Sequence, residues 1–148
     1  MKIYILREDD YDYTSILGVY TKEALDRVMN EMLNEYLKNY NSQLEAIETK
    51  YLKEDNEIRL EYIYRSEEML VLEKKAKQNN DMEQYWSLKR ARKQLLREAQ
   101  KIKDAYDRKI SLLQARFGIF EYTDNSDLLQ IYLNRNNLSV QEFEIIEE

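Results

Sequence analysis

The first twenty residues contain two short stretches in which apolar side chains recur every second position. In "KIYILRE" (2–8), Ile3 and Ile5 alternate with other apolar side chains, and "SILGVY" (15–20) follows after a polar loop. A two-residue period is typical of a strand, and apolar residues in both sets of positions indicate partial cover on both faces. The pattern predicts a β-hairpin, in which Gly18 marks a bulge or a close backbone approach.

A helical pattern follows, and no Gly or Pro interrupts it before Gly118. Thr21 suits the N-cap of the first helix, with Glu23 favourably placed in its first turn. Apolar residues then recur at alternating steps of four and three, which is typical of a coiled-coil seam, with one phase slip near 58–62. The expected seam positions are Leu33, Leu37, Tyr40, Leu44, Ile47, Tyr51, Ile58, Tyr62, Arg65, Met69, Leu72 and Ala76.

A polar segment predicts a turn in the middle of this pattern. In "KQNNDMEQ" (77–84), Asn79 and Asn80 suit a turn, and Asp81 and Gln84 have the spacing of a capping box. The segments on either side, 43–78 and 82–116, have closely similar lengths. Similar lengths around a short turn predict an antiparallel helical hairpin.

A second, weaker signal predicts an earlier break. In "NYNSQLE" (39–45), Ser42 and Glu45 also have capping-box spacing, although the apolar seam runs through this segment. A break here predicts a first helix over 22–40, separate from the helix over 43–78.

The pattern changes again after the long helical segment. Gly118 suits the left-handed position just beyond a helix end. "GIFEYT" (118–123) predicts a short strand, and 124–137 a short helix capped by Asp124 or Ser126. The tail "LSVQEFEIIEE" has features of both a helix start and a strand. We favour the strand, because a two-stranded hairpin needs further strands for stability.

These elements predict an α+β fold that is mostly α. The small antiparallel sheet consists of the N-terminal hairpin and the C-terminal strand, and a long antiparallel helical hairpin extends from it. The expected organisation is a base formed by residues 1–41 and 118–148, with an inserted helical arm over 42–117.

Composition narrows the class of protein. Of 148 residues, 43% are apolar, enough for a core, and 35% are charged, as is typical of long solvated helices. Without cysteine there are no disulfides or thiolate metal sites, which favours a reducing compartment. No apolar run has the length of a membrane span, and the N-terminus becomes acidic too early for a signal peptide. We expect a soluble cytoplasmic protein.

The chain lacks the residue types on which most familiar catalytic and metal-binding sites depend. The chain has no histidine, and its two glycines cannot build a phosphate-binding loop. The acidic "REDDYD" (7–12) lacks the glycine and the final glutamate of an EF-hand loop, so we interpret it as a solvated turn. The expectation is therefore a protein that is not an enzyme, with no catalytic residues, no cofactor and no metal.

Charge is distributed unevenly within the net value of −6. Residues 82–116 carry ten basic and four acidic side chains, or +6, whereas 118–148 carry one basic and seven acidic, or −6. On a helical wheel, a basic stripe lies opposite the apolar face of 82–116. It consists of Lys89, Arg90, Lys93, Arg97, Lys101 and Arg108.

The basic stripe has two interpretations. It could follow a phosphate backbone, which would make the protein a nucleic-acid binder. Alternatively it is a solvated face, balanced by neighbouring acidic segments and by pairs along the helix. The expected pairs are Lys101–Asp104, Asp104–Arg108 and Lys103–Asp107. We favour the solvated face.

The expected hairpin carries more apolar residues near its turn than one seam requires. The surplus consists of Leu60, Ile63, Tyr64, Val71, Met82 and Trp86. Exposed aromatic and Met side chains are typical of protein interfaces, so these six are the candidate protein-interaction site. Helix 22–40, the C-terminal segment or a second copy in a homodimer are alternative covers for this surface. The 13 tyrosines are expected mainly in the core and the seam.

The two ends of the chain resemble a family of small accessory proteins from phages and prophages of low-GC Gram-positive bacteria. "KIYIL…ILGVYTKEAL" matches its strand pair leading through G-V-[FY]-[ST] into a helix, and "QEFEII" (141–146) matches its closing strand. The resemblance implies a phage or mobile-element accessory protein with the helical hairpin as an insertion. It implies no activity and no catalytic residues.

Together these features predict a non-enzymatic protein that binds a host protein, for example an immune nuclease, by occluding it or by trapping one conformation. The alternatives are a nucleic-acid-binding protein that uses the basic stripe, and a structural homo-oligomer.

Overall fold

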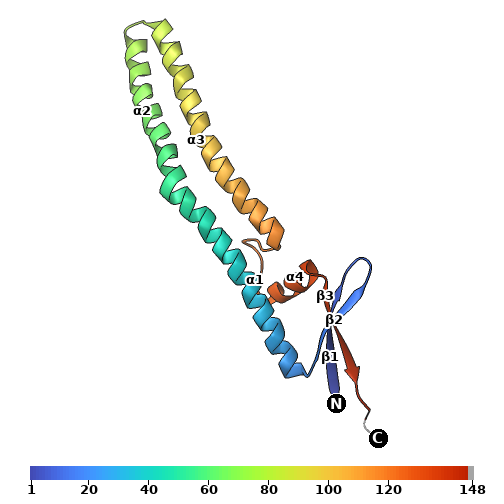
Figure 1. The fold of residues 1–148 in the computed structure, drawn as a ribbon. Coiled ribbons are helices and arrows are strands. Elements are labelled where there is room, and N and C mark those ends of the chain that lie inside the picture. The colour runs from blue at the N-terminus through green and yellow to red at the C-terminus, as the bar shows by residue number, and fades with distance from the viewer. Residues whose placement is uncertain (147–148) are drawn as a thin grey trace. The chain divides into compact units, whose positions relative to one another are not determined.

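The computed structural model describes residues 1–146 and shows an α+β protein that is 71% helical, as expected (Figure 1). A long helical hairpin accompanies a three-stranded antiparallel sheet. The elements in chain order are β1 (Lys2–Asp9), β2 (Thr14–Tyr20), α1 (Lys22–Lys50), a π-helical turn η1 (Tyr51–Asp55), α2 (Asn56–Gln78), α3 (Met82–Phe117), a 3-10 turn η2 (Asn125–Asp127), α4 (Leu128–Arg135) and β3 (Leu138–Glu144).

The chain forms two compact units. The sheet unit consists of residues 1–43 and the chain from Leu112 onward, and the hairpin unit consists of Leu44–Ser111. The sequence predicts the corresponding boundaries at 41–42 and 117–118. Each unit has its own packing.

The sheet of the first unit has the strand order β2-β1-β3, with both pairs antiparallel. The predicted N-terminal hairpin and the predicted C-terminal strand are therefore confirmed. The last two residues of the expected tail strand, 147 and 148, lie outside the described residues. The core against the helices consists of Leu6, Leu25, Met29 and Leu138.

The second strand contains the predicted bulge. Leu6 pairs with Gly18 and Arg7 with Ile16, so Leu17 is the extra residue. The close approach at Gly18 comes from a side chain rather than from backbone, since a Cβ there would lie 2.3 Å from the Tyr20 hydroxyl oxygen. The tyrosine ring lies over the space that the missing side chain leaves.

The predicted start of the first helix is confirmed. Thr21 Oγ1 accepts a hydrogen bond from the backbone N–H of Ala24 at 3.3 Å, and α1 begins at Lys22. The predicted break at Ser42 is wrong, because α1 continues to Lys50. The capping-box spacing is a local signal, and here the uninterrupted helix-forming sequence and the seam through Leu44 outweigh it.

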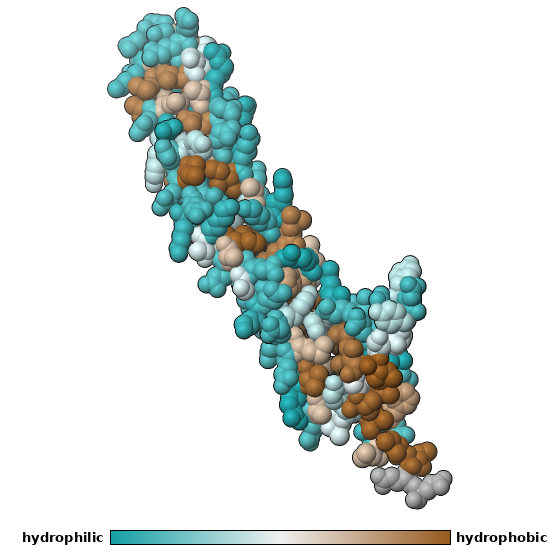
Figure 2. All heavy atoms as spheres, viewed as in Figure 1, coloured by the Kyte–Doolittle hydropathy of each residue, from teal (hydrophilic) through white to brown (hydrophobic). Residues whose placement is uncertain are grey.

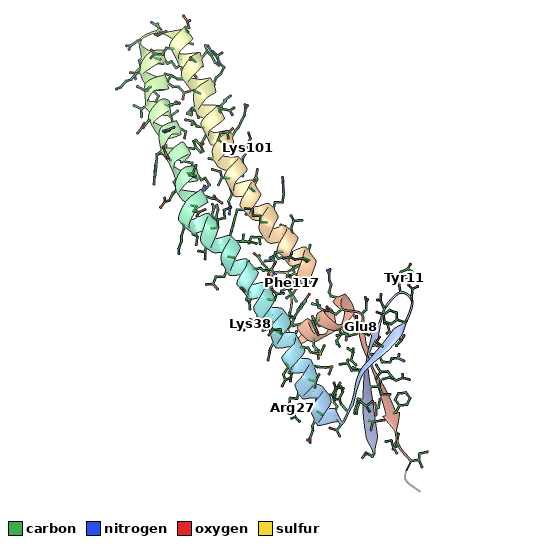
Figure 3. All side chains as sticks on the ribbon, in the orientation of Figure 1. Glu8, Tyr11, Arg27, Lys38, Lys101 and Phe117 are labelled. Atoms are coloured by element: carbon green, nitrogen blue, oxygen red, sulfur yellow. The ribbon has the colours of Figure 1, made fainter. Side chains whose placement is uncertain are left out.

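The end of α3 is also as expected. Gly118 has a φ of +69°, and the N–H of Ile119 donates to the carbonyl of Gln114 at 3.2 Å, which is the Schellman arrangement. Phe117, labelled in Figure 3, is buried against the ring of Tyr36, whose hydroxyl donates to the Phe117 carbonyl at 2.6 Å. Burial raises the pKa of Tyr36.

The strand predicted over 118–123 is wrong. This segment forms a turn, in which the N–H of Thr123 donates to the Phe120 carbonyl and the N–H of Phe120 donates to Thr123 Oγ1. A threonine that can close a turn through its own side chain competes with extended structure. The short helix that follows agrees with prediction, since Asp124 accepts from the N–H of Ser126 and α4 ends at Arg135.

The turn of the hairpin unit is confirmed. Asn80 has a φ of +56°, a conformation that asparagine tolerates better than most residues. Asp81 accepts a hydrogen bond from the N–H of Gln84 at 3.1 Å, and α3 begins at Met82. The predicted helix over 82–116 differs from α3 by one residue.

The phase slip lies earlier than predicted, at the π-helical turn Tyr51–Asp55. A π-helical turn contains an additional residue, so later seam positions lie one residue further along the chain than in an uninterrupted helix. The seam keeps the predicted Tyr62, Met69 and Ala76. Its other positions are Arg59, Ser66 and Glu73, in place of the predicted Ile58, Arg65 and Leu72.

Burial establishes this corrected phase. Ser66 and Glu73 are 4% and 3% exposed, whereas Leu72 is 46% exposed. At Ile58 and Leu72 the sequence prediction is wrong because it favours apolar residues, whereas the polar Arg59 and Glu73 occupy the seam.

We expect Gly118→Ala to lower the free energy of unfolding by about 1–2 kcal/mol, because an L-residue is strained at positive φ. Its Cβ would also lie 2.8 Å from Arg135 Nε. Urea denaturation measures the change. Gly18→Ala is the matched control and should cost less, since its Cβ meets only the far end of the Tyr20 side chain. A larger loss for Gly18→Ala would contradict this assignment.

Candidate protein-interaction surface beside the hairpin turn

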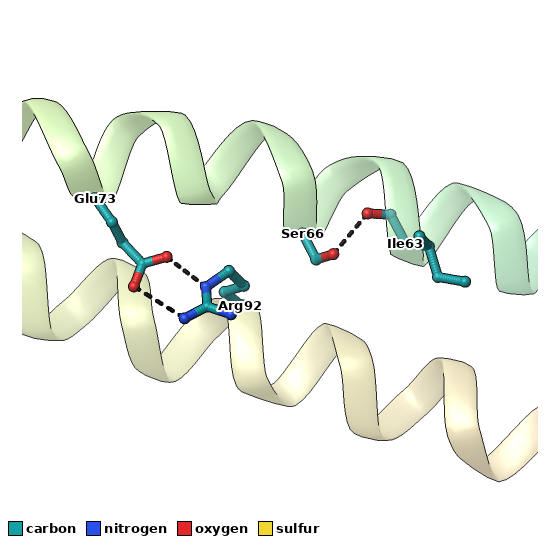
Figure 4. A network of polar contacts seen from close by, with 4 residues as sticks. All are labelled: Ile63, Ser66, Glu73 and Arg92. Carbon is teal, nitrogen blue, oxygen red and sulfur yellow. Dashed lines mark hydrogen bonds and ion pairs between the residues drawn. The ribbon is translucent and has the colours of Figure 1, made fainter.

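A buried ion pair joins the two helices of the hairpin unit (Figure 4). Arg92 of α3 binds Glu73 of α2 through two contacts, Nε to Oε2 and Nη2 to Oε1, the second at 3.3 Å. The side chains are 21% and 3% exposed, respectively. The hydrogen bond to Glu73 raises the pKa of Arg92. An arginine guanidinium is charged throughout the ordinary pH range in any case.

A second polar residue lies in the same seam. Ser66 Oγ donates a hydrogen bond to the Ile63 carbonyl at 2.6 Å, within its own helix. This bond satisfies the buried hydroxyl without a partner on α3. The small side chain suits a close approach of two helices, and Ala99 of α3 is similarly small and buried.

Two stacked tyrosines lie at the end of the hairpin unit that is farther from the turn. The rings of Tyr51 and Tyr106 are 4.1 Å apart between centroids, with an angle of 20° between their planes. Lys103 Nζ lies 4.9 Å from the centroid of Tyr106, close enough for a cation–π contact. Burial raises the pKa of Tyr106. These tyrosines pack in the seam, as the sequence suggested for most of them.

We call the six apolar residues predicted near the turn the turn-end patch: Leu60, Ile63, Tyr64, Val71, Met82 and Trp86. Tyr64 is 59% exposed and Trp86 50% exposed, and Val71 and Met82 are exposed as well. Leu60 and Ile63 are half-buried. Apolar residues gather near this end of the hairpin in Figure 2.

The corrected phase divides the patch between two faces. With Tyr62 at a heptad d position of α2 and Arg92 at an a position of α3, Ile63 and Met82 both lie at e positions, which share one side of an antiparallel helix pair. Leu60 and Trp86 lie next to them, further from the seam. By the same geometry, Tyr64 and Val71 lie on the back of α2, opposite the seam. The structure therefore brings four of the six residues to one side.

Leu70 belongs to this side and was not among the predicted residues. It lies one heptad after Ile63, and it is exposed. Leu72 is also exposed, but it flanks the seam on the other side. The spacing of Ile63 and Leu70 could have revealed the pair, but only after the phase of the seam was known.

The basic stripe lies on the outer side of α3, from which Lys101 extends (Figure 3). Arg90, Lys93, Arg97 and Arg108 are exposed. Lys89 lies over the ring of Trp86, with Nζ 5.1 Å from its centroid. Part of the stripe therefore contacts the turn-end patch.

Only one of the three expected ion pairs along α3 forms. Lys103 pairs with Asp107 at 3.2 Å, as predicted. Lys101 pairs instead with Glu98 at 3.1 Å, and Asp104 accepts a hydrogen bond from the Gln100 side chain. The stripe is thus balanced only in part by its own helix.

Within residues 1–146, no three His, Cys, Asp or Glu side chains gather as a metal ion would require. No helix in this range combines the length and apolar character of a membrane span. No protein-family model, curated protein or solved structure matches the chain.

We expect Arg92→Met to lower the free energy of unfolding by about 3–5 kcal/mol, because it leaves the Glu73 carboxylate buried without its partner. The double variant Glu73→Leu/Arg92→Met should recover most of this loss, since neither charge remains. Urea denaturation of the wild type, the two single variants and the double variant gives the coupling free energy between the two side chains. Additive single losses would contradict a direct pairing.

Proposed function

We propose that the protein is a non-enzymatic binding protein whose turn-end patch contacts a partner protein. The observation that carries the proposal is the exposure of Trp86, the only tryptophan of the chain, with exposed Met82 one helical turn before it on α3. Tryptophan contributes more than most residues to binding energy when a partner covers it. An exposed group of large apolar side chains beside basic residues is typical of such an interface.

The hairpin unit is suited to present this surface without rearrangement. The Glu73–Arg92 pair joins the two helices that carry the patch, so Leu70 and Trp86 keep their relative positions. A surface organised before binding loses less conformational entropy on association. The proposed mechanism is steric occlusion of the partner, or stabilisation of one of its conformations.

The resemblance of the chain ends to phage accessory proteins supports a host protein as the partner. An immune nuclease or another defence effector is the class we propose. The proposal assigns no catalytic residue, cofactor or metal, and places the protein in the cytoplasm.

Binding is tested by capture from host lysate with immobilised wild-type protein, followed by mass spectrometry and reconstitution with the purified partner. We expect Trp86→Glu to weaken the reconstituted complex at least about tenfold, as loss of a central aromatic contact does. Leu52→Glu is the matched control, because Leu52 is an exposed leucine within the π-helical turn of the same unit, away from the patch. Equal affinities for wild type and Trp86→Glu would refute the turn-end patch as the interface.

Tyr64→Glu separates the two faces of the patch. If the partner covers only the side that carries Trp86, Tyr64→Glu keeps wild-type affinity. A loss equal to that of Trp86→Glu would show that the partner also covers the back of α2.

Nucleic-acid binding is the second candidate, and the exposed basic residues of α3 favour it. If the stripe contacts phosphates, affinity for DNA or RNA falls steeply with salt. Reversal of Lys93, Arg97 and Lys101 to Glu then abolishes binding and reduces the salt slope. Under the leading proposal, the same triple variant keeps its affinity for the protein partner, and wild type shows no steep salt-dependent binding.

A further inference from the structure

The sheet has a second face that the helices of its own unit do not cover. Tyr4, Leu6 and Tyr20 belong to the core formed with α1 and α4. Because side chains alternate along a strand, Ile3, Ile5 and Arg7 lie on the opposite face. The strand register extends this second face to β2 and β3, since Val19 pairs with Ile5 and Phe143 pairs with Ile3.

This opposite face is strongly apolar. We call it the open sheet face, and its apolar members are Ile3, Ile5, Ile16, Val19, Phe143 and Ile145. Ile145 lies just beyond β3 but stays in register, because its N–H donates to the Met1 carbonyl at 2.7 Å. Ile16 is 63% exposed and Val19 56% exposed, and Phe143 and Ile145 are exposed too. Apolar residues gather over this sheet in Figure 2.

The charges of the open sheet face indicate what can cover it. Its charged members are Arg7 and Asp9, one of each sign, although residues 118–148 of this unit carry −6 overall. Arg7 Nε is buried and has no hydrogen-bond partner within the described residues. Asp9 accepts hydrogen bonds from Thr14 and Ser139 at 3.0 and 3.1 Å. A face with one charge of each sign is electrostatically complementary to a copy of itself.

The edges of the sheet are less suited to association than its face. The bulge at Leu17 interrupts the pairing pattern of β2, and bulges protect edges against pairing with another chain. On β3, Glu142 and Glu144 would bring like charges together if two copies paired along this edge. Stacking of face on face avoids both obstacles.

We propose that the open sheet face binds the same face of a second copy of this chain. The two three-stranded sheets then form a β-sandwich, with the helices of each copy outside, as stacked sheets pack with interdigitating apolar side chains. Each Arg7 gains access to the Asp9 carboxylate of the other copy. The residues of this surface are distinct from those of the turn-end patch.

The test is the mass of the purified chain by sedimentation equilibrium and by light scattering after gel filtration, across a wide range of protein concentration. We expect twice the 18.1 kDa mass of one chain. Val19→Lys should be monomeric where wild type is dimeric, because it places a charge in the middle of the stacked faces. Far-UV circular dichroism checks that the variant is folded.

Phe143→Lys, on the other outer strand, is the second variant and should give the same result. Trp86→Lys and Leu52→Lys are controls that change exposed apolar residues of the hairpin unit and should remain dimeric. A monomeric wild type at all concentrations would overturn the proposal, whatever the variants do. So would a dimer that persists in folded Val19→Lys or Phe143→Lys. A dimer lost in Trp86→Lys alone would assign self-association to the turn-end patch instead.

Discussion

The pairing of Glu73 with Arg92 is the contact on which the phase of the helical hairpin depends. A carboxylate that is 3% exposed requires a charged partner, because an unpaired buried charge costs several kcal/mol. Any rotation of α2 that moved Leu72 into the seam would separate the pair. The ion pair therefore keeps apolar side chains such as Leu72 outside the seam. A seam chosen only to bury apolar residues would have included them. A buried polar residue that specifies one register among several is a well-attested use of such groups.

The exposed apolar surface of the hairpin follows from this constraint. With Arg59, Ser66 and Glu73 in the seam, part of the apolar content of α2 has no place between the helices. Ile63 and Leu70 consequently flank the seam on the same side as Met82 of α3. Polar seam residues thus specify the packing and leave apolar residues exposed, which is the structural feature on which the proposed function rests.

Local signals predicted most of the fold correctly. Three local features each depend on the chemistry of one residue: the N-cap on Thr21, the hairpin turn on Asn80 and the helix end on Gly118. They can therefore be predicted from the sequence without knowledge of tertiary contacts. The failures came where signals compete. At Ser42 the capping-box spacing predicts a break, but the helix-forming sequence on both sides continues the helix. Over 118–123 the apolar residues predict a strand, but the Thr123 side chain closes a turn. The candidate site was predicted as a set of residues, but not as two faces, because the π-helical turn that sets the phase has no clear sequence signature.

The phase of the seam can be measured directly, because the chain has no cysteine and single cysteines report local exposure. Ser66→Cys and Arg65→Cys place a thiol at adjacent positions, the first in the observed seam and the second in the seam that apolar periodicity predicts. The structure predicts that a thiol reagent labels folded Arg65→Cys at the rate of a free thiol and folded Ser66→Cys far more slowly. Slow labelling at position 65 together with fast labelling at position 66 would contradict this phase, and with it the assignment of the turn-end patch.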